Sequence, residues 1–312
     1  MTRFLRIAAF VLGVALLLPA CKESAGSSKK RRTKWLPYVE QAALDENALR
    51  ARLHVMSREA KTNAPSDTGI VWFPSETILY NAYGQPTMAQ EFDQTGAMVK
   101  ETRSDYQDSL LVRQAVNEKS GYSSAIHTTY NAAKLKVSEL LFQRGDSIMR
   151  REYKVDDLGN ELEVSLIRYR DSSRYKLVTE RDDLGRPVNV KEMQGEKTNW
   201  TETYEISDTL WRILRKETSG KLQSDYEMRF DKEGRITRMV NRNPDGKARI
   251  QVDYTYDAKG HPLTESYIGG NGQPMQTMEF SYDDKGLITE RRLIVPNQPF
   301  VLTTRYTYIF RK

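Results

Sequence analysis

The chain has 312 residues, of which 38% are hydrophobic, and a formal net charge of +6. The positive charge is local, because residues 1–34 hold eight Lys and Arg against one acidic residue, which leaves 40 basic and 41 acidic residues in the remainder. A basic pI of this origin gives no reason to expect a nucleic-acid partner. The single cysteine, Cys21, excludes internal disulfides and thiolate metal sites.

Residues 1–20 have the pattern of a secretory signal peptide. Arg3 and Arg6 precede an apolar run over 7–18, which is shorter than the roughly 20 residues of a membrane-spanning helix. The run ends in Leu18-Pro19-Ala20-Cys21, which resembles the lipobox of bacterial lipoproteins. The resemblance implies that Cys21 is lipidated and holds the protein at the outer membrane, with the periplasmic or cell-surface side left open. An ordinary signal peptide with an unrelated cysteine is the alternative.

Residues 21–34 are polar and basic, and predict a flexible tether. Residues 35–64 are predicted to be helical, because Leu49, Leu53, Met56 and Ala60 recur at helical spacing. A breaker-rich cluster over 62–69 ends this segment. We expect the helix to cover an apolar surface of the remaining chain.

Residues 65–312 change to a period of two, with turn residues every 12 to 14 positions. Three of the turns are 26 residues apart. The pattern predicts a mainly β fold, namely a long antiparallel meander of double-hairpin repeats that forms a curved sheet, a shell or an open barrel. The pattern is weaker over 98–142, where NAAKLKVSELLF can also be read as a helix. Six Asp-x-x-Gly units punctuate the repeat: Asp93 and Gly96, Asp156 and Gly159, Asp182 and Gly185, Asp231 and Gly234, Asp257 and Gly260, and Asp283 and Gly286.

The Asp-x-x-Gly units fit hairpin turns. Aspartate at the first position accepts hydrogen bonds from backbone N–H groups, and glycine at the fourth adopts a positive φ. A set of Ca²⁺ ligands is the alternative, but these carboxylates would be spread along a sheet edge, whereas Ca²⁺ needs six to eight converging oxygens. We therefore expect structural turns and neither a metal nor a cofactor. The unit near 206–211 lacks the glycine, which predicts an irregular hairpin there.

Three phrases place the turn in a wider pattern: Tyr256-Asp257-Ala258-Lys259-Gly260, Phe230-Asp231-Lys232-Glu233-Gly234 and Tyr282-Asp283-Asp284-Lys285-Gly286. They resemble the YD repeat of RHS-type proteins, which recurs on β-hairpins, and the resemblance covers roughly residues 152–290 well and residues 91–100 in part. Large RHS proteins build a β-sheet shell around a toxin and carry a C-terminal processing region. We expect no such region in this chain, so the resemblance does not imply toxin delivery. The chain resembles more the small YD-repeat lipoproteins common in Bacteroidota.

Catalytic motifs are not found. There is no Gly-x-Ser-x-Gly, no His-Glu-x-x-His and no phosphate-binding loop. The histidines His54, His127 and His261 lie far apart in sequence, and His261 follows a turn glycine, which predicts a solvated loop position. We therefore expect no catalytic residues, and an enzyme remains the third hypothesis, to be favoured by an acidic cluster around His127 or His261.

One set of residues forms a candidate binding face. Aromatic residues alternate along three predicted strands, with Tyr226 and Phe230, Tyr254 and Tyr256, and Phe280 and Tyr282 expected on neighbouring strands. Such a row can stack on sugars or grip a peptide or lipid, or it can be the buried face of the sheet. We therefore favour a non-enzymatic envelope lipoprotein that binds or scaffolds a protein or glycan partner. A periplasmic carrier or chaperone with an apolar concavity is the alternative. A transmembrane barrel is disfavoured, since charged residues recur on both faces.

Overall fold

The computed structural model describes residues 38–66 and 69–312. Cys21, the predicted signal peptide and the tether lie outside the described residues. One helix, α2 (Tyr38–Arg52), precedes the strands. The strands are β1 (Val55–Ser66), β2 (Gly69–Tyr80), β3 (Pro86–Phe92), β4 (Met98–Gln107), β5 (Leu110–Glu118), β6 (Ser123–Tyr130), β7 (Lys136–Gln143), β8 (Asp146–Val155), β9 (Glu161–Arg168), β10 (Arg174–Arg181), β11 (Pro187–Gln194), β12 (Lys197–Ile206), β13 (Leu210–Glu217), β14 (Leu222–Phe230), β15 (Ile236–Arg242), β16 (Ala248–Tyr256), β17 (Pro262–Gly269), β18 (Pro274–Tyr282), β19 (Ile288–Ile294) and β20 (Leu302–Phe310).

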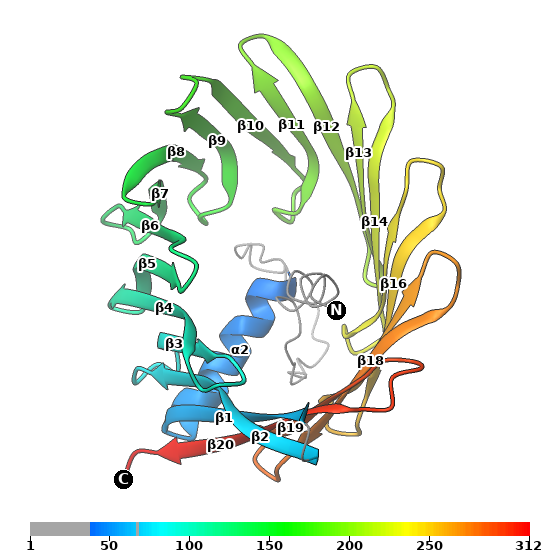
Figure 1. The fold of residues 1–312 in the computed structure, drawn as a ribbon. Helices are drawn as coiled ribbons and strands as arrows, with labels where there is room; N and C mark the ends of the chain where they lie inside the picture. Colours follow the sequence, from blue (N-terminus) through cyan, green and yellow to red (C-terminus); the bar gives the residue numbers. More distant parts are fainter. Residues whose placement is uncertain (1–37, 67–68) are drawn as a thin grey trace, which may run out of the picture.

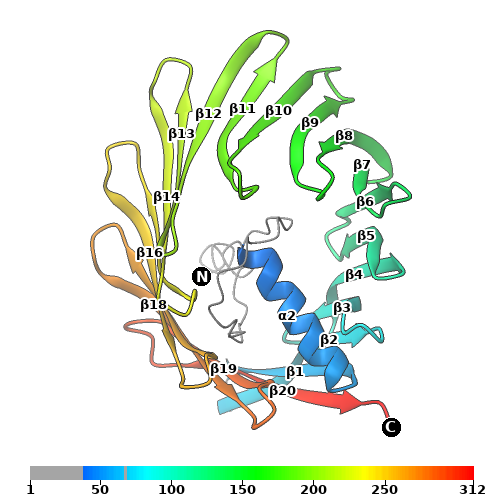
Figure 2. The same cartoon turned by 180° about the vertical axis from the view of Figure 1, so that it is seen from behind.

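The described strands form one closed antiparallel barrel. Each strand pairs with the next, and β1 also pairs with β20, with Thr62 opposite Thr304. The ring is visible along its axis in Figures 1 and 2. The predicted mainly β meander is confirmed, and the sheet is closed. Since barrels of 16–18 strands already leave an aqueous channel, a 20-stranded ring encloses more space than its own side chains fill.

The predicted helical segment is shorter than expected. α2 ends at Arg52, and His54 adopts a left-handed backbone with φ of 54°, which stops the helix. The prediction of a helix through residue 64 was therefore wrong, since β1 begins at Val55. In β1, Met56 is 43% exposed while Val55 is buried, an alternation typical of a strand.

Two other sequence predictions are corrected by the pairing. The segment that could be read as a helix is strand β7, which pairs with β6 and β8. The hairpin β12–β13 is regular, with unbroken register up to Ile206 opposite Trp211. Its Ser207 hydroxyl accepts a hydrogen bond of 3.1 Å from the N–H of Leu210, and so replaces the aspartate. The neighbouring hairpin β14–β15, which has Asp231 and Gly234, carries a register shift beside its turn.

The turns alternate between the two ends of the barrel. The first rim holds the connections β2–β3, β4–β5 and so on to β18–β19, and the second rim holds the others. Asp156, Asp182, Asp231, Asp257 and Asp283 lie on the first rim, whereas Asp93 lies in β3–β4 on the second. We expected Asp93 to continue the series of the later units, and its place on the second rim shows that it does not. An odd number of strands, β4 to β8, separates Asp93 from Asp156, so the two turns lie at opposite ends of the barrel.

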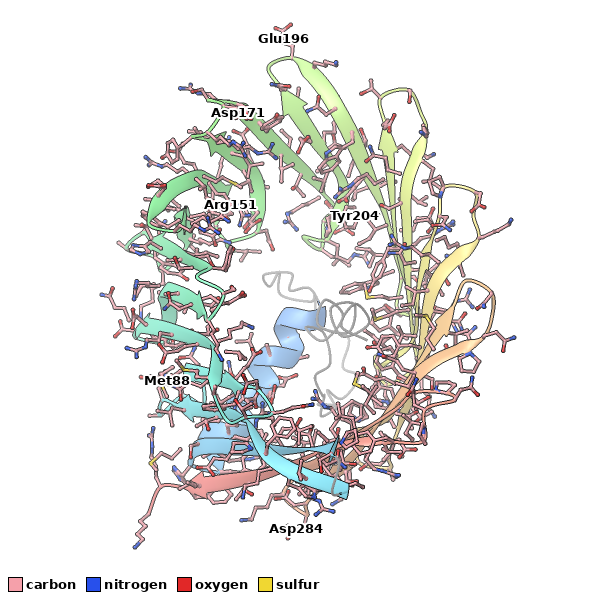
Figure 3. All side chains as sticks on the ribbon, viewed as in Figure 1. Met88, Arg151, Asp171, Glu196, Tyr204 and Asp284 are labelled. Carbon is pink, nitrogen blue, oxygen red and sulfur yellow. The ribbon has the colours of Figure 1, made fainter. Side chains whose placement is uncertain are left out.

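The helix identifies the inner face of the barrel. α2 lies within the outline of the ring in both views, and its Leu49 and Leu53 pack against the cluster of Val55, Tyr80 and Leu287, as Ile78 and Tyr308 do from their strands. Residues that pair across a sheet share a face, and residues two apart along one strand share a face too. Followed from strand to strand, this rule places Tyr204 of β12 on the same inner face, and Tyr204 points into the ring in Figure 3.

The apolar core has two parts. One cluster joins Leu49 and Leu53 of α2 to Val55, Tyr80 and Leu287 at the first rim. The other lies on the inner face of β15–β19, around Val252, Tyr267 and Met278. Among residues 38–66 and 69–312, no helix has the length and apolar character needed to cross a membrane.

Candidate binding face on the inner wall

All six Asp-x-x-Gly units are turns with the same geometry. In the unit at Asp257, the N–H of Gly260 donates to the Asp257 carbonyl (3.1 Å), and Gly260 has φ of 91°. The Oδ1 atom of Asp257 accepts the N–H groups of Lys259 and His261, each at 2.8 Å. The other five units repeat both carboxylate bonds. Each carboxylate therefore binds backbone N–H groups of its own turn, and the six carboxylates lie in six separate turns.

In four of these turns, the second carboxylate oxygen is bound by the residue that follows the glycine. Asp182 pairs with Arg186 and Asp231 with Arg235, each at 2.7 Å, and Asp156 with Asn160 at 2.8 Å. Asp257 pairs in the same way with Nδ1 of His261 (2.9 Å). The pair of His261 and Asp257 is thus one example of a side-chain contact that recurs in these turns.

His261 is therefore not the solvated loop residue that we predicted. Its side chain is 15% exposed and its ring stacks on Tyr282, with the centroids 4.8 Å apart. Burial raises the pKa of Asp257, but the hydrogen bonds from His261 and the backbone outweigh it and hold the pKa below its usual value. His261 also borders a cavity of about 90 Å³ beside α2, together with Asp45, Glu46 and Lys285.

Half of the predicted aromatic face belongs to the first rim. Phe230, Tyr256 and Tyr282 are the last residues of β14, β16 and β18. The same position, or the one before it, holds Tyr80, Tyr106 and Tyr130 in β2, β4 and β6, which sequence reasoning missed although their spacing of 24 to 26 residues was visible. We call these six residues the rim belt.

Three tyrosines of the rim belt hold neighbouring strands together. The hydroxyl of Tyr256 donates to the carbonyl of Ile236 (2.7 Å), and Tyr106 and Tyr130 donate to the carbonyls of Pro86 and Leu111 (each 3.0 Å). Each bond joins the end of one strand to the start of the strand before it, and so clamps the open end of a hairpin. Phe230 packs on Trp211 instead, with ring centroids 5.2 Å apart.

The other half of the predicted face lies deeper on the inner wall. Tyr226, Tyr254 and Phe280 come from β14, β16 and β18, which are alternate strands and not neighbours as we predicted. Met239 of β15 and Tyr267 of β17 lie between them. The hydroxyl of Tyr254 contacts Sδ of Met239 at 3.2 Å.

A buried acid, Glu265, lies within this aromatic group. It pairs across the sheet with Tyr254 and Met278, is 2% exposed, and accepts a hydrogen bond of 3.2 Å from the Tyr267 hydroxyl. Burial raises the pKa of Glu265 to about 7, against the opposing effects of Tyr267 and Arg291. The sequence offered no indication of this, because a single glutamate in an alternating strand usually faces solvent.

Two further inward-facing acids have tyrosine and cationic partners. Glu202 accepts hydrogen bonds from Tyr204 (2.8 Å) and from Nε of Arg215 (2.7 Å), and the Arg215 guanidinium lies 4.2 Å from the ring centroid of Trp200. Glu202 is therefore paired with the cation of Arg215, whereas Glu265 has no salt bridge among the described residues. We call the group on β12–β18 the inner-wall face; it consists of Trp200, Glu202, Tyr204, Arg215, Tyr226, Tyr254, Glu265, Tyr267 and Phe280.

The second of these acids is Glu139, on β7. It accepts hydrogen bonds from the Tyr153 hydroxyl (2.6 Å) and from Arg151 (3.1 Å), while Lys136 lies 4.0 Å from the Tyr153 ring centroid. Arg151 is labelled inside the ring in Figure 3. The inner wall therefore presents aromatic rings and paired charges side by side.

The outer wall is covered with ion pairs between adjacent strands. Examples are Arg238 with Asp253 (2.7 Å), Arg292 with Glu279 (2.8 Å) and Lys191 with Glu180 (2.8 Å). A membrane-spanning barrel presents an apolar band to lipid instead.

Among the described residues, no group of three or more His, Cys, Asp and Glu is placed to hold a metal ion.

Comparison with known proteins gives distant structural matches. No family model and no curated protein matches the chain. A porin-like protein from Bacteroides uniformis superposes with a TM-score of 0.39 at 13% identity, over 82% of this chain and 97% of that one. A porin-like protein from Bacteroides vulgatus gives 0.28 at 9%, over 80% and 97%. The TcdB2-TccC3-TEV structure gives 0.30 at 11%, over 80% of this chain and 18% of that one. Matches this distant assign no role to the chain.

Proposed function

We propose that the protein is a non-enzymatic envelope lipoprotein, anchored through Cys21, that binds a glycan or protein partner on the inner-wall face. The observation that carries the proposal is the combination of aromatic rings and hydrogen-bonded charges on one inward-facing surface. Binding sites typically combine apolar and aromatic lining with a few well-placed polar groups.

The position of α2 supports this role. Its Leu49 and Leu53 pack at Val55, Tyr80 and Leu287, and not on β12–β18. The described helix therefore does not cover the inner-wall face. Within that face, Glu265 and Tyr267 are buried, whereas Trp200, Tyr204 and Tyr254 are half-buried and offer the accessible rings.

The chemistry of the inner-wall face favours a glycan. Flat tyrosine and tryptophan faces stack on sugar rings, and Glu202 and Arg215 offer an acceptor and donors for hydroxyl groups. A purely apolar ligand would leave these charges without solvent, which is costly. The carrier hypothesis rests on the apolar cluster around Val252 and Met278 alone.

The proposal is tested by capturing partners with the intact lipoprotein from its own envelope, followed by titration of the captured glycan or protein. Trp200→Ala and Tyr254→Ala are expected to weaken binding by roughly tenfold or more, the effect of losing a central aromatic anchor. Tyr169→Ala is the control, since Tyr169 is 44% exposed in a turn of the second rim. Recovery of bulk lipid alone, or equal binding by all three variants, contradicts the proposal.

Lipidation is tested separately by metabolic labelling with an alkyne fatty acid. The wild-type chain is expected to incorporate the label, and Cys21→Ser is not. Labelling of Cys21→Ser would overturn the anchor but leave the inner-wall proposal intact.

A further inference from the structure

The hairpin of β1 and β2 is longer than the strands beside it. β1 and β2 pair as far as Ser66 opposite Gly69, with one register shift between Ala60 and Lys61. β20 pairs with β1 only as far as Thr62, and β3 pairs with β2 only from Glu76 onwards. Residues 69–75 of β2 therefore have no described strand on the side that β3 occupies further along.

This free edge is apolar and uncharged. Residues 69–75 read GIVWFPS, without a charged residue in a chain that is 29% charged. Ile70, Val71 and Trp72 are 62%, 42% and 40% exposed. Exposed strand edges are normally protected by charged residues or proline, because they are templates for pairing with another strand. Pro74 limits the free edge to Ile70–Phe73.

The side chains of this edge complement themselves. Trp72 lies on the outer face, where the Arg305 guanidinium is 4.6 Å from its ring centroid. Ile70 shares that face because it is two residues away. An antiparallel pairing of two such edges about Val71 sets Ile70 of each copy opposite Trp72 of the other. Pairs of aromatic and β-branched residues are among the favourable cross-strand pairs.

We propose that the edge Ile70–Phe73 pairs with the same edge of a second copy of this chain. The result is a twofold-symmetric dimer in which the two β2 strands form one continuous antiparallel ladder across the interface. This interface is independent of the inner-wall face. The edge carries no charge that would repel a second copy. The register of the pairing follows from the contacts of Ile70 with Trp72.

The test uses the full mature chain with Cys21→Ser, which leaves no native thiol. Val71→Cys is oxidised with oxidised glutathione, and Leu184→Cys is the control, since Leu184 is 52% exposed in a turn on the first rim. Val71→Cys is expected to form a disulfide-linked dimer roughly tenfold faster, because directly opposed residues have Cα atoms about 4.5–5.5 Å apart, within disulfide range.

Sedimentation velocity gives the second readout. The wild-type chain is expected to sediment as a dimer and Val71→Lys as a monomer, while Leu184→Lys remains a dimer. A monomeric wild-type chain, a dimeric Val71→Lys variant, or equal cross-linking at positions 71 and 184 would each overturn the proposal.

Discussion

The hydroxyl of Tyr256 donates a 2.7 Å hydrogen bond to the carbonyl of Ile236, across the open end of the hairpin β15–β16. The tyrosine of the repeat phrase is thus bound to the scaffold, as its counterparts Tyr106 and Tyr130 are. This relationship separates the rim tyrosines, which bind the backbone of a neighbouring strand, from the deeper residues of the inner-wall face.

Tyr256→Phe removes this bond and keeps the ring. We expect the free energy of unfolding to fall by about 1 kcal/mol, the net value of a typical intramolecular hydrogen bond. Urea denaturation measures the change. Tyr83→Phe is the control, because Tyr83 is 58% exposed in the β2–β3 turn. Equal midpoints for the two variants would contradict the clamp.

Substitutions at two equivalent turn positions, Lys134 and Gly234, are expected to change the stability of the protein in opposite directions. Lys134 has φ of 60° and its N–H donates to the Asn131 carbonyl (2.9 Å), so it occupies the site that glycine fills elsewhere. Lys134→Gly is expected to stabilise the protein by up to about 1 kcal/mol, whereas Gly234→Ala, at φ of 78°, destabilises it by about 1–2 kcal/mol. Thermal unfolding of both variants checks this, and shifts of the same sign would refute it.

Contact between α2 and the first rim is tested by a pair of glycines. A Cβ at Gly84 would clash with the Asn47 carbonyl oxygen, whereas a Cβ at Gly96 meets nothing within 4 Å. Both have positive φ, so Gly96→Ala carries the backbone strain without the clash. We expect Gly84→Ala to increase hydrogen exchange throughout α2 and Gly96→Ala to leave α2 protected. Equal protection of α2 in the two variants would show that the helix is held elsewhere.

Glu265 predicts a dependence of stability on pH. Burial raises its pKa in the folded state from 4.5 to about 7. Between these values the folded state binds more protons than the unfolded state, so stability falls as pH rises through this window and levels off above 7. The loss is about 3 kcal/mol at 1.36 kcal/mol per pKa unit. Glu265→Gln is expected to remove the slope, measured by urea unfolding from pH 4.5 to 8.

A matched control for this slope is Glu279→Gln, which removes an acid of the outer wall that is 38% exposed. That variant should keep the wild-type pH dependence. If Glu265→Gln retains it as well, another group is responsible for the slope.

Local features of the fold could be predicted from the sequence, because they depend on neighbouring residues. Asp257 and Gly260 define their turn without help from the rest of the chain, and the alternation of Tyr254 and Tyr256 defines their strand. The end of α2 could not be located in this way. Leu53, Met56 and Ala60 match a helical spacing, and only the left-handed backbone at His54 shows where the strand takes over.

The candidate site was predictable in part. Tyr226, Tyr254 and Phe280 were identified as one face, but Glu202, Glu265 and Arg215 were not, since a charged residue in a strand gives no local sign of facing inwards. Its position depends on the closure of the ring. Closure depends on the pairing of β1 with β20, between residues that no sequence pattern connects.

The seam between β1 and β20 also has a consequence for biosynthesis. The Thr62 and Thr304 hydroxyls lie 3.0 Å apart but are separated by 242 residues, and the N–H of Arg311 donates to the His54 carbonyl (2.9 Å). The wall can therefore be completed only after β20 has left the ribosome. Until then the nascent sheet has two open edges, and a chain truncated before β20 would keep both edges exposed.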